Sequence, residues 1–152
     1  MTTPVLAPFA GAAVPLSEVP DPVFAQGMLG PGIAVIPDDA AGQLVVVAPV
    51  AGTIMKAMPH AVALVSESGQ GVLVHVGIDT VQLKGEGFEV LVEKKQTVIA
   101  GQELLRVNAG FVREQGYDLI SPVVLMDGDA TQITQPVHGP VASADALFQI
   151  IG

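Results

Sequence analysis

The feature that most constrains the fold is a succession of short apolar runs, rich in β-branched residues and bounded by clusters of Gly, Pro, Asp and Ser. Short runs without sustained helical periodicity indicate strands, and many of them at close spacing indicate antiparallel sheets. We therefore predict an all-β fold, an antiparallel β-sandwich or barrel of many short strands with one or two short helical turns. The expected strands are Ile33–Ile36, Leu44–Ala48, Ala61–Val65, Val72–Val76, Phe88–Val92, Leu104–Val107, Pro122–Met126 and Ala146–Ile151, and the helical turns fall within Pro20–Gly27 and Ala109–Asp118.

The composition limits the classes of partner. The 152 residues include 15 Asp and Glu but only 6 Lys and Arg, a formal net charge of −9. This acidity argues against nucleic acid, because phosphate-backbone binding needs clustered basic side chains. Charged residues make up only 14% of the chain and hydrophobic residues 50%, whereas about 25% charged residues are usual. We therefore expect part of the apolar surface to meet partner proteins.

Other features indicate one cytoplasmic domain. The chain has no cysteine, which excludes disulfides, thiol catalysis and cysteine zinc sites. Its start lacks the basic region of a signal peptide, and no apolar stretch reaches the ~18 residues of a membrane span. The length fits a single domain at residues 1–152, and we expect no direct membrane insertion.

An internal echo is consistent with two related half-units in that domain. The segment Leu6–Gly11, LAPFAG, resembles Val47–Gly52, VAPVAG. Each copy places a Pro and a Gly before a new apolar strand, so the echo favours a folded-over sheet.

The segment His60–Val76 reads as a β-hairpin that carries two histidines. A turn centred between Glu67 and Ser68 places His60 directly opposite His75 on an outer face. The opposite face is small and apolar throughout, so we predict that it faces the core. Val62 and Leu73 accompany the histidines, and the predicted core face holds Ala61, Ala63, Val65, Val72, Val74 and Val76.

Such a pair has three interpretations. The histidines can be structural, with satisfied hydrogen bonds. They can bind a metal, since imidazole is a common ligand and Asp79 follows four residues after His75. They can also transfer a phosphoryl group, with one imidazole as nucleophile and the other donating a hydrogen bond to the transferred group. Spacing alone does not separate the last two interpretations.

The run HVGIDTVQLKGEGF at His75–Phe88 resembles a long motif of the glucose-type enzyme IIA component of the bacterial sugar phosphotransferase system. Other segments follow in the family's order, and the interval between His60 and His75 is also the family's. Together they cover nearly the whole chain, from about Val5 to Ile151. These segments are VPDPVF at Val19–Phe24, GPGIAVIP at Gly30–Pro37, VAPVAGTI at Val47–Ile54, AGQELL at Ala100–Leu105 and SPVVL at Ser121–Leu125.

The resemblance implies an antiparallel β-sandwich and a role for each histidine. His75 corresponds to the histidine that accepts the phosphoryl group, and His60 to the partner that contacts that group. Asp21 and Asp79 match acidic residues that meet the basic face of the histidine phosphocarrier protein. The family's apolar docking patch falls at Phe24, Val62, Leu73 and Val81.

These roles imply a phosphocarrier without a cofactor. It accepts a phosphoryl group from the histidine phosphocarrier protein and passes it to a sugar-specific IIB domain of a membrane permease. Regulatory target proteins that respond to its phosphorylation state are further expected partners. The alternative is a zinc-dependent hydrolase or metal-binding module that uses His60 and His75 as ligands and can add Asp79 as a third.

The resemblance is incomplete around the first histidine. Family members often carry a hydroxyl residue two positions before the first histidine, where this chain has Met58, and the segment before His60 is shorter and contains Pro59. The residue that orients His60 is therefore not evident.

Overall fold

The computed structural model describes residues 2–38 and 40–151. Fourteen strands are the main regular structure of this part of the chain, and the helices are short. The strands are β1 (Thr2–Leu6), β2 (Gly11–Pro15), β3 (Gly32–Pro37), β4 (Gln43–Val47), β5 (Gly52–Met58), β6 (Ala61–Ser66), β7 (Gly71–His75), β8 (Phe88–Val90), β9 (Thr97–Val98), β10 (Glu103–Asn108), β11 (Ser121–Leu125), β12 (Ile133–Thr134), β13 (Gly139–Val141) and β14 (Ala146–Ile151). The α-helices are α1 (Pro22–Ala25) and α2 (Ala109–Glu114), and the 3₁₀ turns are η1 (Leu16–Glu18), η2 (Thr80–Leu83) and η3 (Ala130–Gln132).

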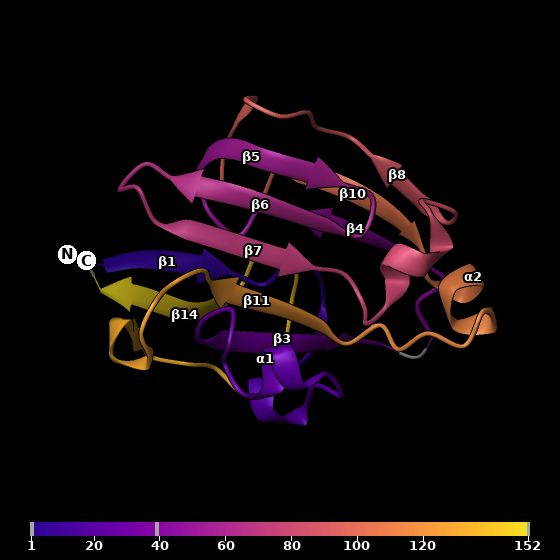
Figure 1. The fold of residues 1–152 in the computed structure, drawn as a ribbon, viewed down its shortest axis with the longest axis horizontal. Helices are drawn as coiled ribbons and strands as arrows, with labels where there is room; N and C mark the ends of the chain where they lie inside the picture. The colour runs from indigo at the N-terminus through magenta and orange to yellow at the C-terminus, as the bar shows by residue number, and fades with distance from the viewer. Residues whose placement is uncertain (1, 39, 152) are drawn as a thin grey trace.

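The strands form three antiparallel sheets around a shared apolar core (Figure 1). The largest sheet has the order β13-β2-β3-β11-β7-β6-β5-β9, and the two smaller sheets have the orders β1-β14-β12 and β4-β10-β8. All eight expected strands and both helical turns are present, so the predicted all-β class is confirmed. In the described ranges no helix is long and apolar enough to cross a membrane.

The two copies of the internal echo lie side by side and exchange equivalent hydrogen bonds. Leu6 N–H donates to the Pro49 carbonyl, and Val47 N–H donates to the Pro8 carbonyl, both over 2.9 Å. Leu6 and Pro8 occupy the same places in the first copy as Val47 and Pro49 occupy in the second. The exchange therefore has local two-fold symmetry, which is consistent with the predicted pair of related half-units.

The predicted register of the β6–β7 hairpin is wrong by one residue. Ala61, rather than His60, pairs with His75, and Val62 pairs with Val74. The cause is the hairpin tip, where Ser66 N–H donates to the Gln70 carbonyl. This bond leaves a three-residue loop that ends at Gly69 in the left-handed region, at φ 86°. Three-residue loops commonly end on such a residue, and an odd loop shifts the pairing by one position.

The shift exchanges the faces of β6, because adjacent strand residues point to opposite sides. Val62 is fully buried in the main core, with no exposed surface. The sequence-based prediction that Val62 belongs to the docking patch is therefore wrong. Ala61 and Ala63 instead share the outer face with Leu73 and His75. The face that packs into the core is formed by Val62, Leu64, Val72 and Val74.

Candidate functional site

The two histidines are neighbours at one end of the large sheet. His75 is the last residue of β7, and His60 lies in the two-residue turn that joins β5 to β6, between the paired Met58 and Ala61. β7 runs towards the end of the molecule that carries α2, away from the two chain termini (Figure 1). The imidazole centroids are 5.3 Å apart and the ring planes lie at 73°, an edge-to-face arrangement. The structure therefore brings the predicted pair together, although not as opposite residues of a ladder.

The backbone orients His60. Its carbonyl accepts a 2.7 Å hydrogen bond from Val76 N–H, which ties the turn to the strand that carries His75. Pro59 directly precedes His60, and its ring fixes its own φ near −65°. Among the described residues no side chain hydrogen-bonds to the His60 ring, and Met58 provides no hydroxyl. The turn and the edge contact with His75 thus hold the His60 ring without a side-chain hydrogen bond.

One hydrogen bond fixes the tautomer of His75. Its Nδ1 lies 2.7 Å from the Gly77 carbonyl oxygen. A carbonyl only accepts, so Nδ1 carries the proton in the neutral ring and Nε2 presents a free lone pair. His75 is therefore prepared to act as a nucleophile at Nε2. The sequence analysis did not identify Gly77 as a site residue. The G-I-D-T-V motif, which begins with Gly77, is the signal that could have identified it.

Burial keeps both imidazoles neutral. Burial is the largest cause that lowers the pKa of His75 below 6.5, and the bond to Gly77 and the carboxylates of Asp21 and Asp79 offset it in part. Burial also lowers the pKa of His60, and the nearby charges of His75 and Lys56 lower it further. At neutral pH the pair therefore offers one nucleophilic nitrogen and one neutral ring that can donate a hydrogen bond.

The acidic residues predicted from the sequence lie within electrostatic reach of His75. Asp21 caps α1, and its carboxylate accepts a 2.9 Å bond from Val23 N–H. Asp79 is exposed and adopts the left-handed conformation, at φ 60°, just before η2. These two carboxylates form a negative rim that favours a basic partner.

The predicted apolar residues divide into three situations. The Phe24 ring packs on the His75 ring, with 5.1 Å between centroids, and only 5% of the residue is exposed. Phe24 therefore supports the imidazole more than it offers free surface. Leu73 is half-buried on the outer face, Val81 is 55% exposed, and Val62 lies in the core as described above. Of the predicted apolar residues, Leu73 and Val81 therefore keep open surface.

A metal site at the two histidines would lack a complete set of ligands. Structural and catalytic zinc sites generally use three or four protein ligands. Within residues 2–38 and 40–151, no group of three or more His, Cys, Asp or Glu side chains is placed to hold a metal ion. A zinc hydrolase built on His60, His75 and Asp79 is therefore not supported.

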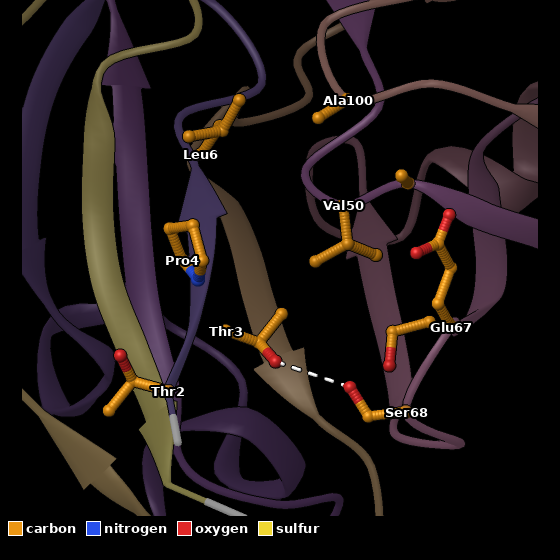
Figure 2. Close-up of a pocket in the computed structure, with 10 residues that line it drawn as sticks. Thr2, Thr3, Pro4, Leu6, Val50, Glu67, Ser68 and Ala100 are labelled. Carbon is orange, nitrogen blue, oxygen red and sulfur yellow. Dashed lines mark hydrogen bonds between the residues drawn. The ribbon is translucent and has the colours of Figure 1, made fainter.

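A cavity of about 270 Å³ lies at the other end of β6 and β7, between β1 and the hairpin tip (Figure 2). Val50 and Leu6 line it, and the Thr3 and Ser68 hydroxyls approach to 3.4 Å at its side. Since β6 and β7 extend about 3.3 Å per residue, the length of these strands separates the cavity from the histidines. The histidines themselves are partly exposed, an arrangement that suits contact with a macromolecule.

Comparisons with known proteins agree with this geometry. Residues 3–131 match the family described as phosphoenolpyruvate-dependent sugar phosphotransferase system, EIIA 1. The chain is 47% identical over 149 residues to the PTS system glucose-specific EIIBCA component of Corynebacterium glutamicum, covering 97% of this chain and 21% of that protein. It is 51% identical over 123 residues to the mannose-specific EIIBCA component of the same species, covering 80% of this chain and 17% of that protein.

A solved structure is also similar over nearly the whole of both chains. Glucose permease IIA from Mycoplasma capricolum superposes with a TM-score of 0.89 at 34% identity, covering 98% of this chain and 96% of that one. The two EIIBCA relatives are much longer, and the chain spans about a fifth of their length.

Proposed function

The chain belongs to the EIIA 1 family of the phosphoenolpyruvate-dependent sugar phosphotransferase system, and on this premise we propose that His75 accepts the phosphoryl group at Nε2. The observation that carries the proposal is the 2.7 Å bond between His75 Nδ1 and the Gly77 carbonyl, beside the ring of His60. That bond leaves only Nε2 free to attack phosphorus. The donor we propose is the phosphohistidine of the histidine phosphocarrier protein.

In the proposed step the bond between phosphorus and the donor's histidine nitrogen breaks as the bond to His75 Nε2 forms. The electron pair of the broken bond stays on the donor ring, and the proton on Nδ1 of His75 stays in place. Gly77 then stabilises the positive charge that develops on the ring. In such an in-line transfer, the protein contributes mainly position and electrostatic stabilisation.

His60 is the proposed stabiliser of the transferred group. Its ring meets the His75 ring edge-on at 5.3 Å, close enough for a ring N–H to donate to a phosphoryl oxygen. A neutral imidazole does this without the strong ion pair that an imidazolium would form. The phosphoryl group is thereby held in place but can still leave, as onward transfer requires.

Docking of the donor is proposed to combine apolar contact with charge. Leu73 and the exposed Val81 provide apolar surface, and Asp21 and Asp79 provide the negative rim around His75. A modest apolar patch with a charged rim is typical of transient complexes. A basic face on the carrier protein fits this arrangement.

The proposed acceptor of the phosphoryl group is the cysteine of a IIB domain. The phosphorus–nitrogen bond at His75 breaks as a phosphorus–sulfur bond forms, and the histidine returns to its neutral form. The names of the EIIBCA relatives support a IIB partner for this chain, and regulatory target proteins remain a further proposal. The relatives carry different sugar names, so we propose no particular sugar.

The test is phosphorylation by phosphoenolpyruvate, the general phosphotransferase enzyme and the histidine phosphocarrier protein. We expect one acid-labile, base-stable phosphate on the chain. His75→Gln abolishes labelling, whereas His60→Gln is labelled but transfers poorly to a IIB domain. His138→Gln is the matched control, because His138 is exposed and lies outside the site. Normal labelling of the His75 variant contradicts the proposal.

A further inference from the structure

Two consecutive peptide units after His75 are held at both ends by hydrogen bonds. In the Val76–Gly77 unit, the Val76 carbonyl accepts a 2.5 Å bond from the Thr80 hydroxyl, and Gly77 N–H donates to the Ser121 hydroxyl over 3.2 Å. In the Gly77–Ile78 unit, the Gly77 carbonyl accepts from His75, and Ile78 N–H donates to the Asp118 carbonyl over 2.9 Å. The carbonyl that sets the tautomer of His75 is therefore fixed through the backbone on either side of it.

Ser121 has a role that a residue without a hydroxyl cannot take. It is completely buried, with no exposed surface. Its Oγ accepts from Gly77 N–H and donates to the Leu119 carbonyl over 2.7 Å. One hydroxyl thus links the turn after His75 to the strand segment that enters β11. Only a group that both donates and accepts can make these two bonds.

The local backbone depends on this support. Gly77 adopts φ 71°, and a Cβ there would lie 2.7 Å from Thr80 Cγ2 and 2.8 Å from the Asp118 carbonyl oxygen. The turn is thus packed closely against the groups that hydrogen-bond to it. A turn that loses one of those bonds inside a buried environment has to move to satisfy the freed N–H.

We propose that Ser121 and Thr80 are positioning residues for phosphoryl transfer, which hold the Gly77 carbonyl against His75 Nδ1 and so keep Nε2 as the nucleophile. The inference rests on the proposed function of His75, which it deepens. Neither hydroxyl touches the reacting atoms. Removing the Ser121 hydroxyl releases Gly77 N–H, the carbonyl turns away from the ring, and both neutral tautomers of His75 become populated.

The chain offers a closely matched control. Ser66 is also buried, at 5% exposure, and its hydroxyl accepts from Gln70 N–H over 3.1 Å and donates to the Gln70 side chain over 3.2 Å. It therefore makes the same kinds of bonds as Ser121. Ser66 lies at the hairpin tip, six residues beyond His60 and thus roughly 20 Å along the strand. Ser66→Ala removes a comparable hydroxyl without touching the turn after His75.

The experiment compares Ser121→Ala, Ser121→Thr and Ser66→Ala with the parent chain. Nitrogen-15 NMR of the imidazole rings at pH 8 reports the tautomer, and the rate of phosphorylation by the histidine phosphocarrier protein reports function. We expect only the Nδ1–H form of His75 in the parent, Ser66→Ala and Ser121→Thr. Ser121→Ala shows a mixture of tautomers and accepts phosphate roughly 10- to 100-fold more slowly.

An unchanged Nδ1–H tautomer in Ser121→Ala overturns the proposal, even if the rate falls, because the effect is then only structural. If Ser121→Ala does not fold, Thr80→Val replaces it, since it removes the other hydroxyl at nearly constant shape and predicts the same tautomer mixture. A parent chain that is not phosphorylated contradicts the proposed function instead. The NMR comparison stands separately from that result.

Discussion

The β6–β7 register predicts opposite effects for two valines that the sequence places in one docking patch. Val62→Ala removes two buried methyl groups, since Val62 has no exposed surface. At ~0.8 kcal/mol per buried carbon, transfer accounts for about 1.6 kcal/mol. The cavity left behind raises the expected loss in free energy of unfolding to about 2–3 kcal/mol. For a chain of this length, the melting temperature falls by roughly 4–12 °C.

Val81→Ala is the matched control, because Val81 belongs to the same predicted docking patch but is 55% exposed. We expect its free energy of unfolding to change by less than about 0.5 kcal/mol. Urea unfolding followed by circular dichroism measures stability, and labelling from the phosphorylated carrier protein measures the rate. At a temperature where both variants are folded, Val81→Ala lowers the labelling rate at limiting donor, whereas Val62→Ala leaves it unchanged. A stable Val62→Ala that is labelled slowly refutes the register and restores Val62 to the surface.

Three further predictions concern the site. Gly77→Ala forces an L-residue to φ 71° against the Asp118 carbonyl. The free energy of unfolding should therefore fall by at least about 1–2 kcal/mol, and labelling should be slow. A stable and fully active variant contradicts the account of the turn. Because burial lowers the pKa of His75 below 6.5, the labelling rate should stay level as pH falls from 8 to 6.5 and decline only below it, and a decline centred above 6.5 is inconsistent with that burial. The lowered pKa also means that His75 takes up a proton at higher pH in the unfolded chain than in the folded chain. The free energy of unfolding should therefore fall as pH drops through 6.5, until the folded ring is also protonated. In the same urea titration, the free energy of unfolding of His75→Gln should fall less steeply. Asp79→Asn keeps a residue that tolerates φ 60° but removes a rim charge, so association with the carrier should slow by roughly 2- to 10-fold at low salt and depend less on salt; an unchanged salt dependence of the rate means that the rim does not steer docking.

Much of the fold could be predicted because its signals are local. The runs at Ile33–Ile36 and Val72–Val76 are apolar and β-branched, and both became strands. The echo predicted a strand after Gly52 but not its extent, because the residues of β5 alternate irregularly and a bulge interrupts its pairing between Ile54 and Lys56. β1 was not predicted, since Pro4 lies within it and its partner strand is β14, at the other end of the chain.

In the candidate site, too, local features could be predicted from the sequence and long-range contacts could not. The adjacency of His60 and His75 followed from the hairpin, but the side of β6 that faces the core depended on Gly69 adopting a left-handed conformation at the tip. The conformation of one loop residue thus determines that Val62 faces the core. The bond between Gly77 and Ser121 joins residues 44 positions apart. No local pattern encodes such a contact, because it arises only when β11 packs beside β7.

The nitrogen that carries the phosphoryl group tests the central claim most directly. Nitrogen-15-labelled protein, phosphorylated by the histidine phosphocarrier protein, can be studied by NMR through the coupling between phosphorus and the ring nitrogens. We predict coupling to Nε2 of His75, with Nδ1 still protonated and bonded to the Gly77 carbonyl. Phosphorus on Nδ1 of His75, or on a ring of His60 or His138, would contradict the account.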